Sequence, residues 1–224
     1  MKIEKLKINH LENPVGFALE TPTVSYKVSG AKGVRQKCAR VVLAEDEGFE
    51  SIVYDSKDSE EIVSTGFELP VTLKPIKRYY WKVEVTDDTG DKAVSDTAMF
   101  ETARSGEWKA QWITPDTDKK TQVVLFKDIE LKRKPKAARA YIAGLGVYEF
   151  YLDGQKQGRE CLLPGFCDYD SWIQYQTFEI ELKEGKNRFE IALGDGWYKG
   201  RYGINVDYTE ENYGDKLSAI AEIY

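Results

Sequence analysis

One short run of residues restricts the fold of this chain more than any other feature. From Tyr79 to Val85, aromatic and branched apolar residues occupy every second position, and Tyr80, Lys82 and Glu84 lie between them. Side chains along a β-strand point alternately to the two faces of a sheet, so this spacing predicts a strand with one buried face.

The residues around this run indicate the kind of sheet protein. Leu73 and Pro75 form a Leu-x-Pro turn, and Tyr79 follows four residues after the proline. This arrangement resembles the tyrosine corner of fibronectin type III sandwiches, in which the phenol bonds back to the backbone of the turn. Asp88-Thr-Gly90 then predicts a hairpin turn.

Further strand-like segments follow one another along the chain, separated by clusters of glycine, proline, asparagine and aspartate. In the first half of the chain, strands are expected at 23–28, 39–44, 62–69, 79–86 and 98–102. In the second half, they are expected at 123–131, 138–143, 147–152, 175–182, 188–193 and 217–224.

The two series of strands predict two domains. An Arg-Ser-Gly-Glu sequence at 104–107 interrupts the apolar pattern, and 224 residues exceed the common size of one domain. We therefore expect an all-β chain with a fibronectin type III-like β-sandwich at 1–104 and a jelly-roll-like β-sandwich at 105–224. The last predicted strand reaches the final residue, so we expect the second sandwich to be truncated and to continue in a longer parent protein.

Charge and composition exclude several classes of partner. The net charge of -6 is spread along the chain and would repel phosphate backbones, so nucleic acid is not expected. No apolar run is long enough to span a bilayer, and the first eleven residues carry no export signal. Three cysteines are an odd number that favours reduced thiols, and one histidine is too few for a zinc site. These features predict a cytoplasmic protein, unless a signal peptide has been removed.

Ordered sequence motifs in both halves resemble the N-terminal region of bacterial α-L-rhamnosidases (glycoside hydrolase family 78). The first half carries the motifs Gly33-Val-Arg-Gln36-Lys-Cys-Ala39, Val53-Tyr-Asp55-Ser56, Arg78-Tyr-Tyr-Trp81-Lys-Val83 and Phe100-Glu-Thr102. The second half carries Trp108-Lys-Ala-Gln-Trp112-Ile113, Ala138-Arg-Ala-Tyr141, Leu152-Asp-Gly154, Pro164-Gly165, Tyr169, Gly185-Lys-Asn187 and Leu193-Gly-Asp195-Gly-Trp197-Tyr198. The chain departs from the family at Asp153-Gly154, where the family tends to have Asn-Gly.

The resemblance implies that catalysis belongs to a different part of the parent enzyme. The family hydrolyses terminal α-L-rhamnosides with inversion, on a helical toroid that follows the β domains and is absent from this chain. Inversion needs an acid and a base carboxylate about 6.5 to 9.5 Å apart. The carboxylates at 45–47, 87–88 and 210–211 lie in predicted turns or exposed stretches, where water keeps the acid near its usual pKa. We therefore expect no catalytic residue and no activity in this chain alone.

Two predicted loops combine aromatic residues with carboxylates, as sugar-binding sites do. The glycine-rich loop from Asp195 to Tyr202 places Asp195 beside Trp197 and Tyr198, and the loop after Pro164 holds Asp168 and Trp172. Some family members bind L-rhamnose on this sandwich with calcium, for which the candidate ligands here are Asp153, Asp168 and Asp195. The alternative is that these glycines serve tight turns and the aromatic residues pack structurally.

Three hypotheses follow for function. The chain is a non-catalytic accessory region that packs on or orients the catalytic domain, or an independent module that binds L-rhamnose-containing glycans, or a structural, adhesion-type sandwich protein. No cofactor is expected other than calcium. The last predicted strand leaves an open sheet edge, through which the chain could self-associate.

Overall fold

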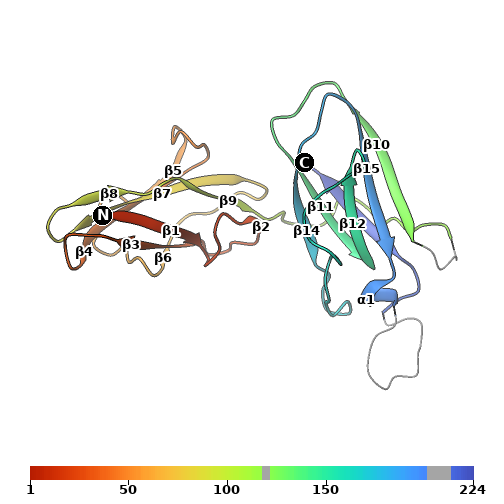
Figure 1. Cartoon of the computed structure of the whole chain (residues 1–224), viewed down its shortest axis with the longest axis horizontal. Coiled ribbons are helices and arrows are strands. Elements are labelled where there is room, and N and C mark those ends of the chain that lie inside the picture. The colour runs from red at the N-terminus through yellow and green to blue at the C-terminus, as the bar shows by residue number, and fades with distance from the viewer. Residues whose placement is uncertain (118–121, 201–212) are drawn as a thin grey trace, which may run out of the picture. The chain divides into compact units, whose positions relative to one another are not determined.

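A computed structural model describes residues 1–117, 122–200 and 213–224. The chain forms two compact units, Met1–Gly106 and Glu107–Tyr224, which run from red to yellow-green and from green to blue in Figure 1. This division lies two residues beyond the boundary suggested by the sequence. No helix within the described ranges is long and apolar enough to cross a membrane.

The first unit consists of two β-sheets that enclose one apolar core. One sheet has the order β1 (Lys2–Ile8), β3 (Thr23–Ser29), β6 (Phe67–Glu68). The other has the order β2 (Val15–Phe17), β9 (Ala98–Thr102), β7 (Arg78–Asp87), β4 (Gln36–Ala44), β5 (Ile52–Asp55), and β8 (Lys92–Val94) also pairs with β7. The arrangement is a β-sandwich, as expected from the sequence.

The alternation that predicted β7 is confirmed in detail. Tyr79, Trp81, Val83 and Val85 are all buried in the core, whereas the residues between them are partly exposed. The backbone N–H of Lys74 donates a hydrogen bond to the Tyr79 hydroxyl at 2.9 Å. The predicted tyrosine corner is therefore present.

The strand expected at 62–69 is shorter than predicted. Only Phe67 and Glu68 pair with β3, although Ile62 and Leu69 are buried in the core. The Ile62 carbonyl accepts a hydrogen bond from the side chain of Gln36 at 2.6 Å, so this backbone group is bound outside any sheet ladder. The apolar pattern identified core residues here, but not their backbone pairing.

The second unit also consists of two sheets. One has the order β10 (Val123–Leu131), β15 (Gly185–Gly194), β12 (Val147–Leu152), β13 (Gln155–Lys156). The other has the order β14 (Tyr175–Ile180), β11 (Ala138–Leu145), β16 (Ser218–Ile223), and a single turn of helix, α1 (Gly196–Lys199), follows β15. A second, separate apolar core lies between these sheets.

The three-stranded sheet is covered on both faces. Ala140 and Ile142 of β11 face the core, while Tyr141, on the other face of this strand, is also fully buried. Residues at the start of the unit cover the face of the sheet on which Tyr141 lies. Trp108 packs edge-on against Tyr175. The Glu222 carboxylate accepts hydrogen bonds from the backbone N–H groups at 109 and 110. The sheet is thus fixed from both sides.

Candidate functional site

Two loops that the sequence nominated separately meet at one end of the second unit. The ring of Tyr169, in the loop before β14, lies 5.2 Å from the ring of Tyr198 in α1 and 5.2 Å from that of Tyr213. The Tyr213 N–H also donates to the Tyr198 carbonyl at 3.0 Å. Three segments distant in sequence are therefore joined by one cluster of tyrosines.

The loop before β14 is held in shape by Asp168. The carboxylate accepts a hydrogen bond from the Ser171 hydroxyl at 2.7 Å, and the Asp168 carbonyl accepts from the N–H groups of Ser171 and Trp172. Cys167 and Tyr169 on either side of it are buried. Asp168, a predicted ligand contact, thus has a structural role in its own loop.

The other loop depends on a glycine at the start of α1. Gly196 has a φ of +57°, and a Cβ atom at this position would lie 2.8 Å from the backbone nitrogen of Val147. Only glycine suits both the left-handed conformation and this close approach. Asp195, just before it, is exposed, and its side chain does not cap the helix.

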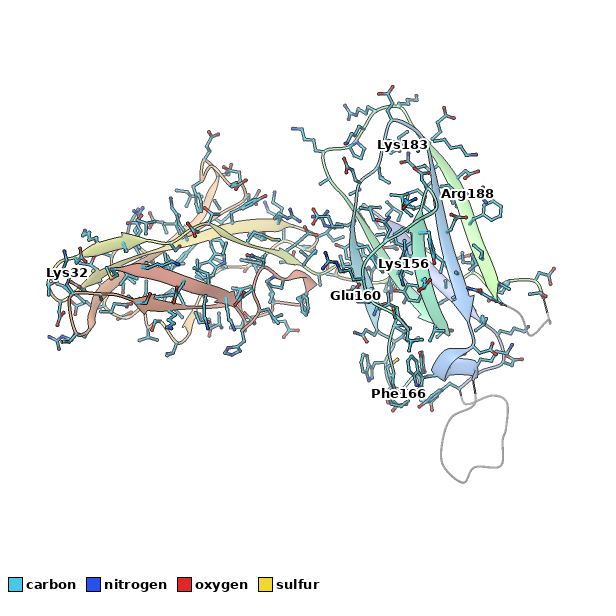
Figure 2. All side chains as sticks on the ribbon, viewed as in Figure 1. Lys32, Lys156, Glu160, Phe166, Lys183 and Arg188 are labelled. Carbon is cyan, nitrogen blue, oxygen red and sulfur yellow. The ribbon has the colours of Figure 1, made fainter. Side chains whose placement is uncertain are left out.

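Apolar side chains on the loop before β14 point into solvent. Leu162 is 59% exposed, Phe166 55%, Trp172 54% and Ile173 37%. We call these four residues the apolar loop face; Figure 2 shows Phe166 at the end of the second unit where α1 lies. The sequence singled out only Trp172 among them, because no sequence pattern reports the exposure of loop residues.

Two carboxylates lie near the Tyr198 phenol at this end. Burial raises the pKa of the Tyr198 phenol above its usual value, and the nearby charges of Asp215 and Asp170 raise it further. Trp197 and Tyr198 are partly buried. The predicted residues Arg201 and Tyr202 lie outside the described residues. Carboxylate oxygens beside aromatic rings are suited to hydroxyl groups and C–H surfaces rather than to anions.

The three candidate calcium ligands are not brought together. The Asp153 carboxylate accepts hydrogen bonds from the Arg188 N–H at 2.8 Å and from Lys183 at 2.6 Å, at the start of β15. Asp195 follows the end of β15, about 20 Å away along an extended strand. Asp153 and Asp195 therefore do not share one ion. In the described part of the chain, no group of three or more His, Cys, Asp or Glu side chains could hold a metal.

Comparisons with known families match both units. Residues 3–105 match the family described as "Rha78A-like, N-terminal immunoglobulin domain", and residues 133–224 match "Alpha-L-rhamnosidase N-terminal domain". An α-L-rhamnosidase of Formosa agariphila is 27% identical to this chain over 96% of its length. One from Alteromonas sp. is 27% identical over 84%. The chain spans only 26% and 23% of these two relatives.

Solved structures show the same arrangement of strands. The α-L-rhamnosidase from Dictyoglumus thermophilum matches all of this chain with a TM-score of 0.82 at 26% identity, and 27% of that chain is covered. An α-L-rhamnosidase from Aspergillus terreus matches 99% of this chain with a TM-score of 0.83, again over 27% of its own length. At 23% identity, the second match supports the fold alone.

Proposed function

Because the chain belongs to the α-L-rhamnosidases and corresponds to their N-terminal domains, we propose that it packs on the catalytic domain of such an enzyme and stabilises it. The parent reaction in this proposal is the inverting hydrolysis of terminal α-L-rhamnosides. The chain itself contributes no catalytic group.

The apolar loop face is the observation that carries this proposal. Its four side chains lie within twelve positions of one loop and are between 37% and 59% exposed. The loop is not a loosely packed tail, since Tyr169 and Asp168 anchor it. In this proposal, these exposed side chains on an ordered loop are the contact site for the catalytic domain.

The first experiment compares two proteins with a chromogenic α-L-rhamnoside as substrate. One is this chain, and the other joins it to the catalytic domain of an α-L-rhamnosidase. We expect hydrolysis only by the longer protein. Activity of the 224-residue chain alone would contradict the proposal.

A second experiment tests the docking surface itself. In the longer protein, Phe166→Ser combined with Trp172→Ser should lower the melting temperature and the half-life of activity, because both side chains leave a buried interface. Phe126→Ser is the matched control, since Phe126 is 62% exposed on a different part of the unit. Equal effects of the two changes, or none from the first, would refute docking through this face.

Carbohydrate binding at the same end is a second candidate. The contact between Tyr169 and Tyr198 brings the loop of Asp168 and Trp172 beside that of Asp195 and Trp197. Titration of the chain with L-rhamnose, with and without calcium, should then give a saturable change in tryptophan fluorescence that Trp197→Ala abolishes. No response at millimolar sugar would exclude this candidate.

A further inference from the structure

A row of side chains crosses the solvent face of the four-stranded sheet. Strand register places Phe126 of β10 opposite Glu190 of β15, Glu190 opposite Tyr151 of β12, and Tyr151 opposite Lys156 of β13. Directly paired residues project from the same face of a sheet. The alternate residues of these strands, such as Leu125, face the core. The rings of Phe126 and Tyr151 are separated by two strand spacings, or about 10 Å.

Phe126 is exposed but firmly held. Its side chain is 62% exposed, and the Arg188 guanidinium carbon lies 4.1 Å from the ring centroid. The Arg188 guanidinium forms ion pairs with the Glu190 carboxylate at 3.3 Å and with the Asp128 carboxylate at 3.7 Å. Figure 2 marks Arg188 on this sheet. One side of the ring is therefore packed against a positioned cation, and much of the ring remains open to solvent.

The other end of the row is equally ordered. The Glu149 carboxylate accepts hydrogen bonds from the Tyr151 hydroxyl and from the Lys156 ammonium, each at 2.5 Å. Side chains already held by their neighbours lose little conformational entropy when they bind a ligand.

The charge on this face selects the class of ligand. Arg188, Lys156 and Lys186 supply three positive charges, and Asp128, Glu130, Glu149 and Glu190 supply four negative ones. A phosphate or a polyanion would meet carboxylates at every position. A neutral molecule with many hydroxyl groups would find donors and acceptors in pairs, and aromatic rings for its C–H faces.

We infer that the outer face of β10, β15 and β12 is a binding platform for a neutral oligosaccharide. Phe126 and Tyr151 support two sugar rings, and Arg188 and Glu190 bond to the hydroxyl groups between them. The platform involves neither the apolar loop face nor the loops of Asp168 and Asp195. The test of the platform is therefore independent of the function proposed above.

The test is protein-observed NMR of the 224-residue chain titrated with two neutral probes, α-L-rhamnosyl-(1→6)-glucose and cellotetraose. At least one probe should cause saturable shifts in residues of β10, β12 and β15. Phe126→Ala should weaken that binding at least tenfold, and Glu190→Gln should weaken it while preserving side-chain shape. Phe17→Ala is the matched control, because Phe17 is 48% exposed in the first unit, and it should change nothing.

Three results would overturn the inference. One is the absence of saturable shifts at tens of millimolar of both probes. Another is shifts confined to the loops around Trp172 and Trp197, with binding lost in Trp172→Ala instead. The last is unchanged affinity in Phe126→Ala, whose fold is checked by its NMR spectrum.

Discussion

Asp87, at the end of β7, ties the loop before β4 to the hairpin after β7. Its carboxylate accepts hydrogen bonds from the Thr89 hydroxyl at 2.6 Å and from the N–H groups of Gly33, Thr89 and Asp91. These bonds favour the charged form, and they lower the pKa of Asp87 from 3.8 to about 2. Asp87 is also buried, so the expectation that water keeps this carboxyl near its usual pKa is wrong.

This shift gives a prediction for acid stability. A carboxyl group with a lowered pKa in the folded state stabilises it above pH 4, and that contribution is lost as the pH falls from about 4 to about 2. Asp87→Asn should therefore unfold at lower urea than the parent chain at pH 6, and the difference should shrink toward pH 2. Asp96→Asn, at an exposed aspartate, is the control. A difference that does not change with pH would contradict this account.

Tyr79 offers a second prediction for a single residue. Its side chain is 1% exposed and stacks on Phe100, and its hydroxyl accepts the Lys74 N–H. Tyr79→Phe keeps the packing but leaves that N–H without its partner, which should cost about 1 to 3 kcal/mol. Urea denaturation measures the loss, and Tyr80→Phe, on the more exposed face of the same strand, should change stability by less than about 0.5 kcal/mol.

At the scale of elements, tight connections depend on glycines in the left-handed region. Gly154, in the hairpin between β12 and β13, has a φ of +76°, and a Cβ atom added there would meet no other atom within 4 Å. Asp153 before it has a φ of +50°. Two consecutive positive φ values are typical of a type I′ turn. Asp153 thus retains the hairpin that Asn-Gly would form.

Two substitutions separate backbone conformation from steric contact. Gly154→Ala meets only the conformational penalty, and we expect a loss of about 1 kcal/mol. Gly196→Ala has a similar φ but also places its Cβ against the backbone of Val147, so its loss should be clearly larger. Thermal unfolding compares the two variants. Equal losses would show that the contact between α1 and β12 is unimportant.

At the scale of the whole molecule, two apolar cores imply two units of stability. Trp81 is buried among residues of the first unit only, and Phe150 among residues of the second only. Trp81→Ala should cost about 3 to 5 kcal/mol and unfold the first unit selectively, and Phe150→Ala should do the reverse. NMR spectra of the two variants would show which resonances lose dispersion. Loss of both sets in either variant would contradict independent cores.

Features of this chain that depend on short-range interactions follow from the sequence more closely than strand pairing does. The bounds of β10 and β12 match the predicted segments, and the tyrosine corner at Tyr79 is present. In contrast, the strand predicted at 62–69 is reduced to Phe67 and Glu68. The pattern of apolar residues indicates which side chains are buried, and Ile62 is buried. However, the partner of the Ile62 backbone carbonyl is a side chain from β4.

Local sequence patterns predict the all-β class, most strands and the tight turns, because these depend on residues that are neighbours along the chain. Which loops meet depends on tertiary packing. The order of strands in the sheets placed Tyr169 against Tyr198 and left Asp153 at the opposite end of β15 from Asp195. Tertiary packing also exposed Phe166 and aligned Phe126 with Tyr151 across β15. Exposure and cross-strand alignment depend on residues distant in the chain, so no local pattern encodes them.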